Sequence, residues 1–187
     1  MLQRLMNDHK HIAVLLNLLK GKYQKLAEGE QVNFCLVRDV VEYMQEYADH
    51  SHHPVEDIVY EYYVGKFAKE ESTKRLTEEH GKVVAASAAL ASTLNLILND
   101  IVVAKEKLVQ ELRDYVTLQE QHMIYEEEYI FPKLQRKLTE SDWEQIERNC
   151  ALKLIDDPLF SSDDQMFDEL RQYIQTVEPT SGMSLGH

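Results

Sequence analysis

The chain has 187 residues, of which 44% are hydrophobic and 28% are charged, so it can bury the core of one ordinary globular domain. Its formal net charge of −13 disfavours sequence-independent binding to nucleic acid or to an anionic membrane, because both require basic patches. No apolar run approaches the roughly 18 residues of a membrane span, and the N-terminal apolar stretch is too short for a signal peptide. Two cysteines without metal-like spacing favour a reduced, cytoplasmic protein.

The first part of the chain predicts two long helices joined by a short turn. Residues 2–27 carry an apolar stripe at helical spacing, and Gly29 is well placed to end that helix. Asn33 is a suitable cap for the second helix. Pro54 removes one backbone hydrogen bond, so it either kinks a continuous second helix or starts a new helix after a break. We expect the continuous, kinked helix.

The middle of the chain predicts two further long helices. A third helix over about 72–98 is rich in alanine and leucine, and we expect it to be well buried. Gly81 lies in the middle of this helix, where it either permits close helix packing or gives a small ligand access. The turn Asn99-Asp100 then leads to a fourth helix over about 101–136.

The C-terminal part of the chain predicts a smaller helical extension. The run Ser141-Asp142-Trp143-Glu144 matches a capping box that opens a fifth helix, and a short helix follows over about 163–176. We expect an all-α protein, with an up-down-up-down four-helix bundle over residues 1–138 and a C-terminal helical extension over 139–187. The extension either packs on the bundle or forms the surface of a homodimer.

Two copies of one spacing carry the chemistry. A histidine precedes a glutamate by four residues in each copy, so both side chains leave the same face of a helix. A lone histidine precedes the two copies by 43 and 42 residues, which suits a helix hairpin that returns to the same depth. The six candidate metal ligands are therefore His9, His52, Glu56, His80, His122 and Glu126.

Histidine and carboxylate together suit iron, manganese or zinc, whereas a structural zinc site usually contains cysteine. Two octahedral ions have twelve ligand positions. Four histidines, two bridging carboxylates and a shared oxo or hydroxo group fill ten of them, which leaves one open position on each ion. Each His-x-x-x-Glu pair by itself is also consistent with a salt bridge at the surface, so the prediction of a two-metal site depends on their combination.

The choice between two neighbouring histidines stays open in the sequence. His52 matches the spacing of the second copy, but His53 also pairs with Glu56, at a separation of three residues. We prefer His52, and His11 is expected at the surface. Three nearby carboxylates are expected either to support the ligands or to lie at the surface, namely Asp57, Glu79 and Glu127.

These segments resemble the hemerythrin-like proteins, the HHE cation-binding domain family. The matching pieces are NDHKHIAVLLNLL, HHPVED, LTEEHG and HMIYEEEYIFPKL, which span roughly residues 5–138. The resemblance implies a four-helix bundle that holds two iron ions in an oxo- or hydroxo-bridged, non-haem centre. It also implies a dioxygen, nitric oxide or peroxide ligand, and a role in sensing, stress response or iron–sulfur cluster repair.

The resemblance includes one departure. Oxygen-carrying hemerythrins have five histidines, with a His-x-x-x-His pair on the third helix, whereas Leu76 and Val84 flank His80 at that spacing here. We therefore expect four histidines and a more open centre, nearer to the repair or stress-response branch. The alternatives are a ferritin-like iron oxidase and a helical interaction bundle with a structural metal. No nucleophile–base pair or phosphate-binding loop indicates hydrolytic or kinase chemistry.

Overall fold

The computed structural model describes residues 1–67, 71–160 and 167–177, and these residues form helices and no strand. The helices in chain order are α1 (Leu2–Ala27), α2 (Phe34–Tyr43), the π-helix η1 (Met44–His52), α3 (His53–Phe67), α4 (Glu71–Leu98), α5 (Lys105–Tyr125), the π-helix η2 (Glu126–Ile130), α6 (Phe131–Lys137), α7 (Glu140–Cys150) and α8 (Asp168–Val177). The prediction of an all-α fold is confirmed.

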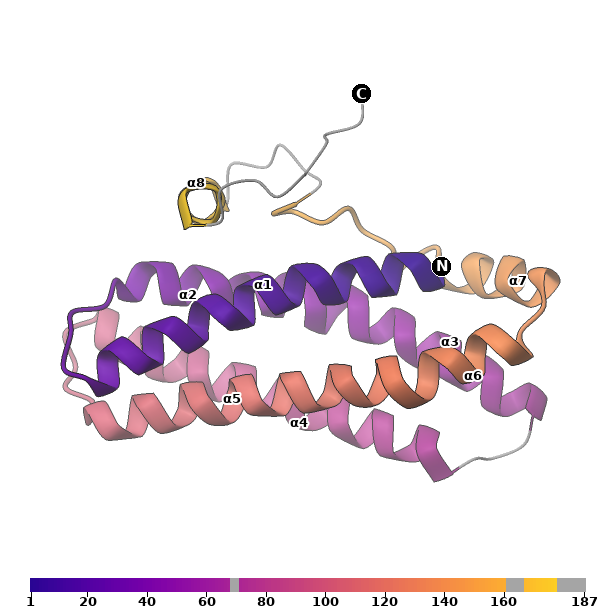
Figure 1. Cartoon of the computed structure of the whole chain (residues 1–187), viewed down its shortest axis with the longest axis horizontal. Helices are drawn as coiled ribbons and strands as arrows, with labels where there is room; N and C mark the ends of the chain where they lie inside the picture. Colours follow the sequence, from indigo (N-terminus) through magenta and orange to yellow (C-terminus); the bar gives the residue numbers. More distant parts are fainter. Residues whose placement is uncertain (68–70, 161–166, 178–187) are drawn as a thin grey trace.

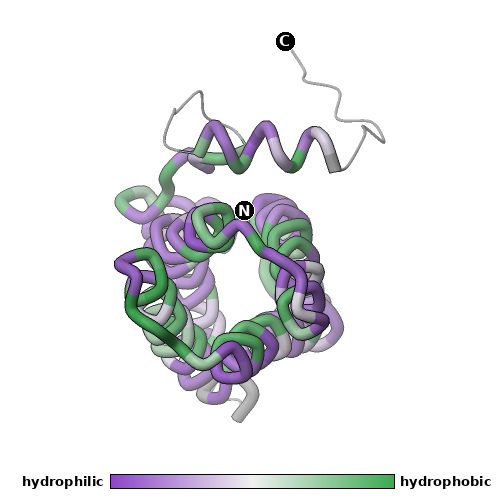
Figure 2. Tube along the Cα trace, turned by 90° about the vertical axis from the view of Figure 1, so that its left-hand side faces the viewer, coloured by the Kyte–Doolittle hydropathy of each residue, from purple (hydrophilic) through white to green (hydrophobic). Residues whose placement is uncertain are grey.

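Four long helical stretches run alternately in opposite directions, as expected for an up-down-up-down bundle (Figure 1). They are α1, the stretch from α2 through α3, α4, and the stretch from α5 through α6. Figure 2 looks along the bundle and shows these four stretches arranged around one interior, with α8 lying across the outside.

The second helical stretch continues through Pro54 without a break, which agrees with the preferred of the two predictions. The His53 amide donates to the carbonyl of Ala48, five residues back, so a π-helical turn precedes the proline. An α-helical turn would set the Pro54 ring against the carbonyl four residues back, and the wider turn relieves this clash.

The fourth helical stretch repeats this feature before Pro132. The Phe131 amide donates to the carbonyl of Glu126, again five residues back, in the π-helix η2. Both π-helices include or adjoin candidate ligands, since η1 ends at His52 and η2 begins at Glu126. The two-fold repeat of the sequence thus extends to the backbone.

Two helix starts differ from the predictions. The helix expected from about residue 101 begins at Lys105, because Asp100 adopts a left-handed φ of 60° and the chain that follows it is not helical. Val102 is 96% exposed, so its apolar side chain does not extend the buried stripe. The capping box of α7 is formed by Thr139 and Asp142, not by the run that begins at Ser141.

The outer face of α4 is exposed, although the sequence predicts a well-buried helix. Leu90 and Leu94 face the core, whereas Val84 and Leu96 are 41% and 39% exposed. The segment Arg75–Leu98 is long and apolar enough to cross a membrane by length and composition. This is weak evidence for a membrane span, because α4 packs against α2 and α5 and core helices of soluble proteins pass the same test.

Gly81 lies on the exposed side of α4, and a Cβ atom added there meets no other atom within 4 Å. Close helix packing therefore does not require this glycine. We expect Gly81→Ala to stabilise the protein by about 0.5–1 kcal/mol, because glycine is the poorer helix former. Thermal unfolding of the metal-free protein measures this change, and a lower melting temperature would contradict it.

Two apolar clusters fill the bundle on either side of a polar layer. The larger cluster includes residues from 12–26 of α1 and 108–123 of α5, and the smaller one includes Leu5 and residues from 130–138. The candidate ligands lie between these clusters on every one of the four helical stretches. The polar layer is therefore enclosed by apolar side chains along the bundle axis.

The C-terminal extension packs against the bundle. On α7, Asp142 accepts hydrogen bonds from Tyr62 and Lys66 of α3 at 2.7 and 2.5 Å. Leu159 and Leu170 are buried in the larger apolar cluster. Residues 161–166 and 178–187, which include the start of the predicted last helix and the predicted tail, lie outside the described residues. The division into domains at residue 138 stays a prediction.

Candidate metal centre

The polar layer contains seven buried side chains that can bind a metal, and together they come from all four helical stretches. They are His9, His52, His53, Glu56, His80, His122 and Glu126. The structure thus brings the six predicted residues together and adds His53. Most of their inward-facing atoms have no hydrogen-bond partner within the described part of the chain, namely His9 Nε2, His80 Nε2, His122 Nε2, both carboxylate oxygens of Glu56, and Glu126 Oε2.

Glu56 faces a different set of histidines with each of its oxygens. Its Oε1 lies 3.5 Å from His9 Nε2 and 3.4 Å from His52 Nε2. Its Oε2 lies 3.4 Å from His80 Nε2. A carboxylate with its two oxygens facing two sets of donors is suited to bridge a pair of metal ions.

Glu126 also faces three histidines of the same layer. Its Oε2 lies 3.3 Å from both His9 Nε2 and His122 Nε2, and its Oε1 lies 3.7 Å from His80 Nε2. The hydroxyl of Tyr60 donates to Glu126 Oε1 at 2.7 Å and so fixes the carboxylate. Tyr60 lies four residues after Glu56, so the sequence could have predicted from this spacing that Tyr60 shares the helix face of the ligand.

The separations between donors fit ions held between them. Two ligands that each lie about 2.1 Å from one ion, at tetrahedral or octahedral angles, are about 3.0–3.5 Å apart. The donor atoms form two groups, each with ligand atoms within 4.8 Å of one another. The first group is His9, His52 and Glu56, and the second is His53, Glu56, His80 and His122. Since Glu56 belongs to both groups, the donor set fits two ions that share a carboxylate.

Both histidines of the alternative that the sequence left open lie in the polar layer. His52 and His53 are both buried, and they lie in different donor groups. The wide π-helical turn before Pro54 changes the helical spacing so that consecutive histidines both face the interior. The sequence signal for His53 was its three-residue separation from Glu56.

A carboxylate lies beside the outward-facing Nδ1 atom of every one of these histidines. The pairs are His9 with Glu127 at 2.9 Å, His52 with Asp8 at 3.1 Å, His53 with Asp49 at 3.4 Å, His80 with Asp57 at 2.9 Å and His122 with Glu79 at 3.3 Å. Four of these pairs are hydrogen bonds, whereas His53 Nδ1 and Asp49 Oδ1 have no hydrogen-bond partner within the described residues. The four hydrogen-bonded carboxylates are placed to hold the proton on Nδ1 and direct the Nε2 lone pair to a metal.

Three of these five carboxylates were among the expected residues. Asp8 and Asp49 were missed by the sequence analysis. Asp49 lies four residues before His53 on the same helical stretch, which is a usable signal. Asp8 adjoins His9 but contacts His52 of another helix, so no local spacing could reveal its role.

In the metal-free protein, protonated histidines of the polar layer supply the positive charge that bound metal ions would otherwise supply. Burial alone would lower the pKa of His9, but Glu126 and Glu56 outweigh it and raise that pKa to about 11. The pKa of His80 is raised to about 12 in the same way, by Asp57 and both glutamates. Burial would raise the pKa of Glu126, as would Glu56, but the histidines lower it to about 2. Burial lowers the pKa of His53 to about 4, so this ring is neutral.

Replacement of a supporting carboxylate tests this arrangement. We expect Asp57→Ala to lower metal affinity about 10- to 100-fold, because His80 loses the group that orients its ring. Competition with a chelator of known affinity measures this loss. The control is Glu61→Ala, which removes an exposed carboxylate of the same helix. Equal affinities in the two variants would contradict the role of Asp57.

Comparison with known proteins agrees with this geometry. The family model of the hemerythrin HHE cation-binding domain matches residues 1–134, which contain all seven buried side chains of the polar layer. No curated protein and no solved structure matches the chain significantly. A match over this much of the chain, together with a helical bundle around a buried histidine and glutamate cluster, shows that the protein belongs to the hemerythrin HHE cation-binding domain family.

Proposed function

We propose that this protein holds two iron ions in its polar layer and binds dioxygen, nitric oxide or peroxide there. The observation that carries the proposal is the convergence of five buried histidines and two buried glutamates, most of which have an inward-facing atom without a hydrogen-bond partner within the described residues. This mixture of imidazole and carboxylate suits iron, and the layer contains no cysteine of the kind typical of structural zinc sites. Iron bound there would supply redox chemistry and an open position for a small ligand.

The fifth histidine changes the ligand count. With His53, five histidines, two bridging carboxylates and a shared oxygen fill eleven of the twelve positions of two octahedral ions. Only one position of the whole centre is then open. With four histidines, two positions would be open, one on each ion. We place it beside His9 and His52, since their donor group is the smaller of the two.

The apolar surroundings favour small ligands in this position. The Phe131 ring lies 5.1 Å from the His9 ring, and the two apolar clusters close the layer at both ends. The biological use of the ligand follows the family resemblance, and we propose sensing, stress response or iron–sulfur cluster repair. A cytoplasmic location and a homodimer stay proposals of the same kind.

Anaerobic loading with Fe(II) tests the proposal. We expect about two irons per chain by metal analysis. Titration with nitric oxide should saturate near one ligand per centre in the unmodified protein and near two in His53→Ala. His50→Ala is the control, because this neighbouring histidine is exposed. Full occupancy by zinc that iron cannot replace would overturn the proposal.

A further inference from the structure

A tyrosine lies one carboxylate away from the candidate ligand His52. The Tyr47 hydroxyl donates to Asp8 Oδ1 at 3.0 Å, and Asp8 Oδ2 lies 3.1 Å from His52 Nδ1. Tyr47 is 1% exposed. A continuous chain of hydrogen bonds therefore runs from the side of the centre with the smaller donor group to a buried phenol.

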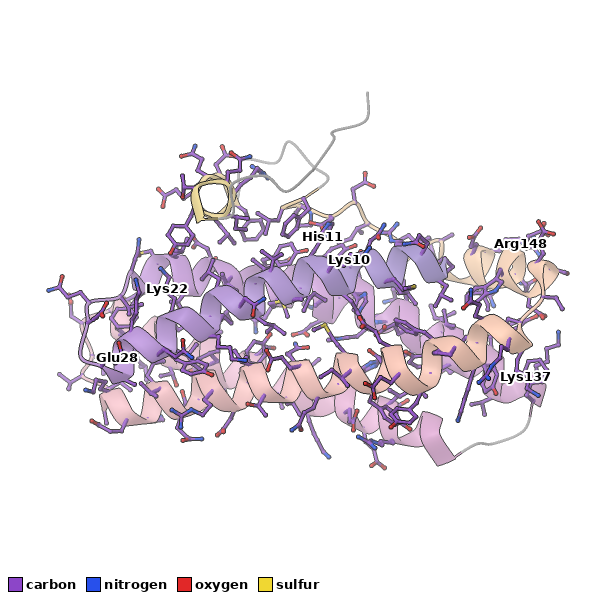
Figure 3. All side chains as sticks on the ribbon, viewed as in Figure 1. Lys10, His11, Lys22, Glu28, Lys137 and Arg148 are labelled. Atoms are coloured by element: carbon purple, nitrogen blue, oxygen red, sulfur yellow. The ribbon has the colours of Figure 1, made fainter. Side chains whose placement is uncertain are left out.

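A second tyrosine continues the path toward the surface. The Tyr43 ring stacks on Tyr47, with ring centroids 5.7 Å apart and planes inclined by 26°. The Tyr43 hydroxyl donates to Asp157 Oδ2 at 3.0 Å, and the same oxygen lies 3.0 Å from His11 Nδ1. His11, expected at the surface, is instead partly covered, and its ring stacks on Phe160 at 4.1 Å. Figure 3 shows His11 on the side of α1 that faces the C-terminal segment, meaning the described residues 151–160 that follow α7.

Each tyrosine thus has its own carboxylate base. A phenol that loses an electron must also lose its proton, and a buried phenol can do so only to a hydrogen-bonded acceptor. Burial, and then Asp8 or Asp157, raises the pKa of Tyr47 and of Tyr43 well above the ordinary value, so both phenols keep their protons until they are oxidised.

The proton also has a route to solvent. Asp8, Tyr47, His11 and Asp157 line one cavity of about 230 Å³ between α1 and the C-terminal segment. A proton received by either carboxylate can therefore leave through this cavity or through the partly exposed His11. The cavity, the stacked rings and the paired carboxylates connect the His52 side of the polar layer to the surface.

We infer that Tyr47 and Tyr43 form an electron relay between the metal centre and the surface under the C-terminal segment. The inference rests on the proposed di-iron function. Iron held in the polar layer would supply the site at which hydrogen peroxide is reduced to two waters, a change that breaks the O–O bond and takes up two electrons and two solvent protons. When only one ion of the pair is ferrous, that ion would supply one of the electrons. Tyr47 supplies the other, passes its proton to Asp8 and becomes a tyrosyl radical. Tyr43 then reduces Tyr47 and passes its own proton to Asp157.

Two other buried tyrosines provide comparisons. Tyr60 also donates to a carboxylate, but that carboxylate is the candidate ligand Glu126, so its proton would compete with the metal for the same group. The hydroxyl of Tyr115 accepts from Gln119 at 3.2 Å, and it donates to no carboxylate among the hydrogen bonds of the described residues. Tyr115→Phe is therefore a matched control for a buried phenol without a base.

Rapid freeze-quench electron paramagnetic resonance tests the relay. The iron-loaded protein is first oxidised by one electron per centre, so that one ferrous ion remains, and is then mixed with hydrogen peroxide. We expect an organic radical whose spectrum narrows when the protein contains ring-deuterated tyrosine. Tyr47→Phe should lower the radical yield about tenfold or more, and Tyr115→Phe should leave it unchanged. Tyr43→Phe should keep the radical and lengthen its lifetime about threefold or more, because the second step is blocked.

Iron content and the optical spectrum of each variant are measured before peroxide is added. Failure of the unmodified protein to bind iron would overturn the proposed function at that step. If the protein binds iron but forms no tyrosyl radical, the relay alone is overturned. A radical that persists in Tyr47→Phe and disappears in Tyr60→Phe would also overturn it.

Discussion

Glu56→Ala is expected to reduce the iron content from about two ions per chain to less than one. One oxygen of Glu56 faces His9 in the first donor group, and the other faces His80 in the second. This variant therefore removes a ligand from both ions at once. The loss of affinity should exceed the roughly 100-fold upper range seen when a supporting carboxylate is removed. Glu126→Ala should also lower the iron content, because the carboxylate of Glu126 faces His9, His122 and His80.

Metal analysis after anaerobic loading and removal of free iron gives this result directly. Glu61→Ala is the matched control, since Glu61 is an exposed glutamate on the same helix. Glu56→Gln keeps the size of the side chain and removes its charge, which separates loss of the ligand from loss of packing. Two irons per chain in both alanine variants would mean that these glutamates are not ligands.

Metal binding is expected to release about two protons per chain from His9 and His80 at neutral pH, besides any proton lost by a bridging water. Affinity should therefore rise at least about 100-fold for each pH unit between pH 7 and 9. In the metal-free protein, Glu126 and Glu56 outweigh burial and raise the pKa of His9 to about 11, and with Asp57 they raise that of His80 to about 12. Both rings are therefore charged, and each must lose the proton on Nε2 before that atom can bind a metal.

The stability of the metal-free protein should change with pH in the opposite direction. The raised pKa of His9 contributes stability that is fully present below the ordinary histidine pKa of 6.5 and is lost as pH rises toward about 11. The difference in melting temperature between the loaded and metal-free protein should therefore widen as pH increases above 6.5.

Titration calorimetry with Co(II) in buffers of different protonation enthalpy counts the released protons. His11→Ala should leave the count unchanged, because His11 lies on the outer side of α1 against Asp157 and not in the polar layer. Binding without proton release would show that His9 and His80 are neutral in the metal-free protein. In that case protonated His9 and His80 would not balance the charge of the glutamates in the metal-free protein.

The sequence predicted most of the polar layer because the relevant information is periodic along single helices. His52 with Glu56, and His122 with Glu126, share a helix face at a separation of four residues. The near-equal spacing of the two repeats then placed His9 and His80 at the same depth of the bundle. These are properties of a helix and its length, and they require no knowledge of which helices touch.

The features that were missed depend on contacts between helices or on a change of helix type. His53 faces the centre because η1 is a π-helix, and Pro54 alone does not specify a π-helical turn. Asp8 supports His52 across a helix interface, at a sequence separation that no periodicity marks. The sequence predicts that α4 is well buried, whereas its outer face is exposed, because alanine suits both environments and only packing decides between them.

The sequence by itself therefore determined the all-α bundle and the six candidate ligands, because helical periodicity and ligand spacing are local properties. Its resemblance to the hemerythrin family was carried by short segments around these residues. The tertiary structure alone decided that a fifth histidine joins the polar layer and that a carboxylate lies beside each of the five histidines of this layer. It also decided that Tyr47 and Tyr43 connect His52 to the C-terminal segment. These features arise where separate helices meet, and their geometry is set by packing across the bundle.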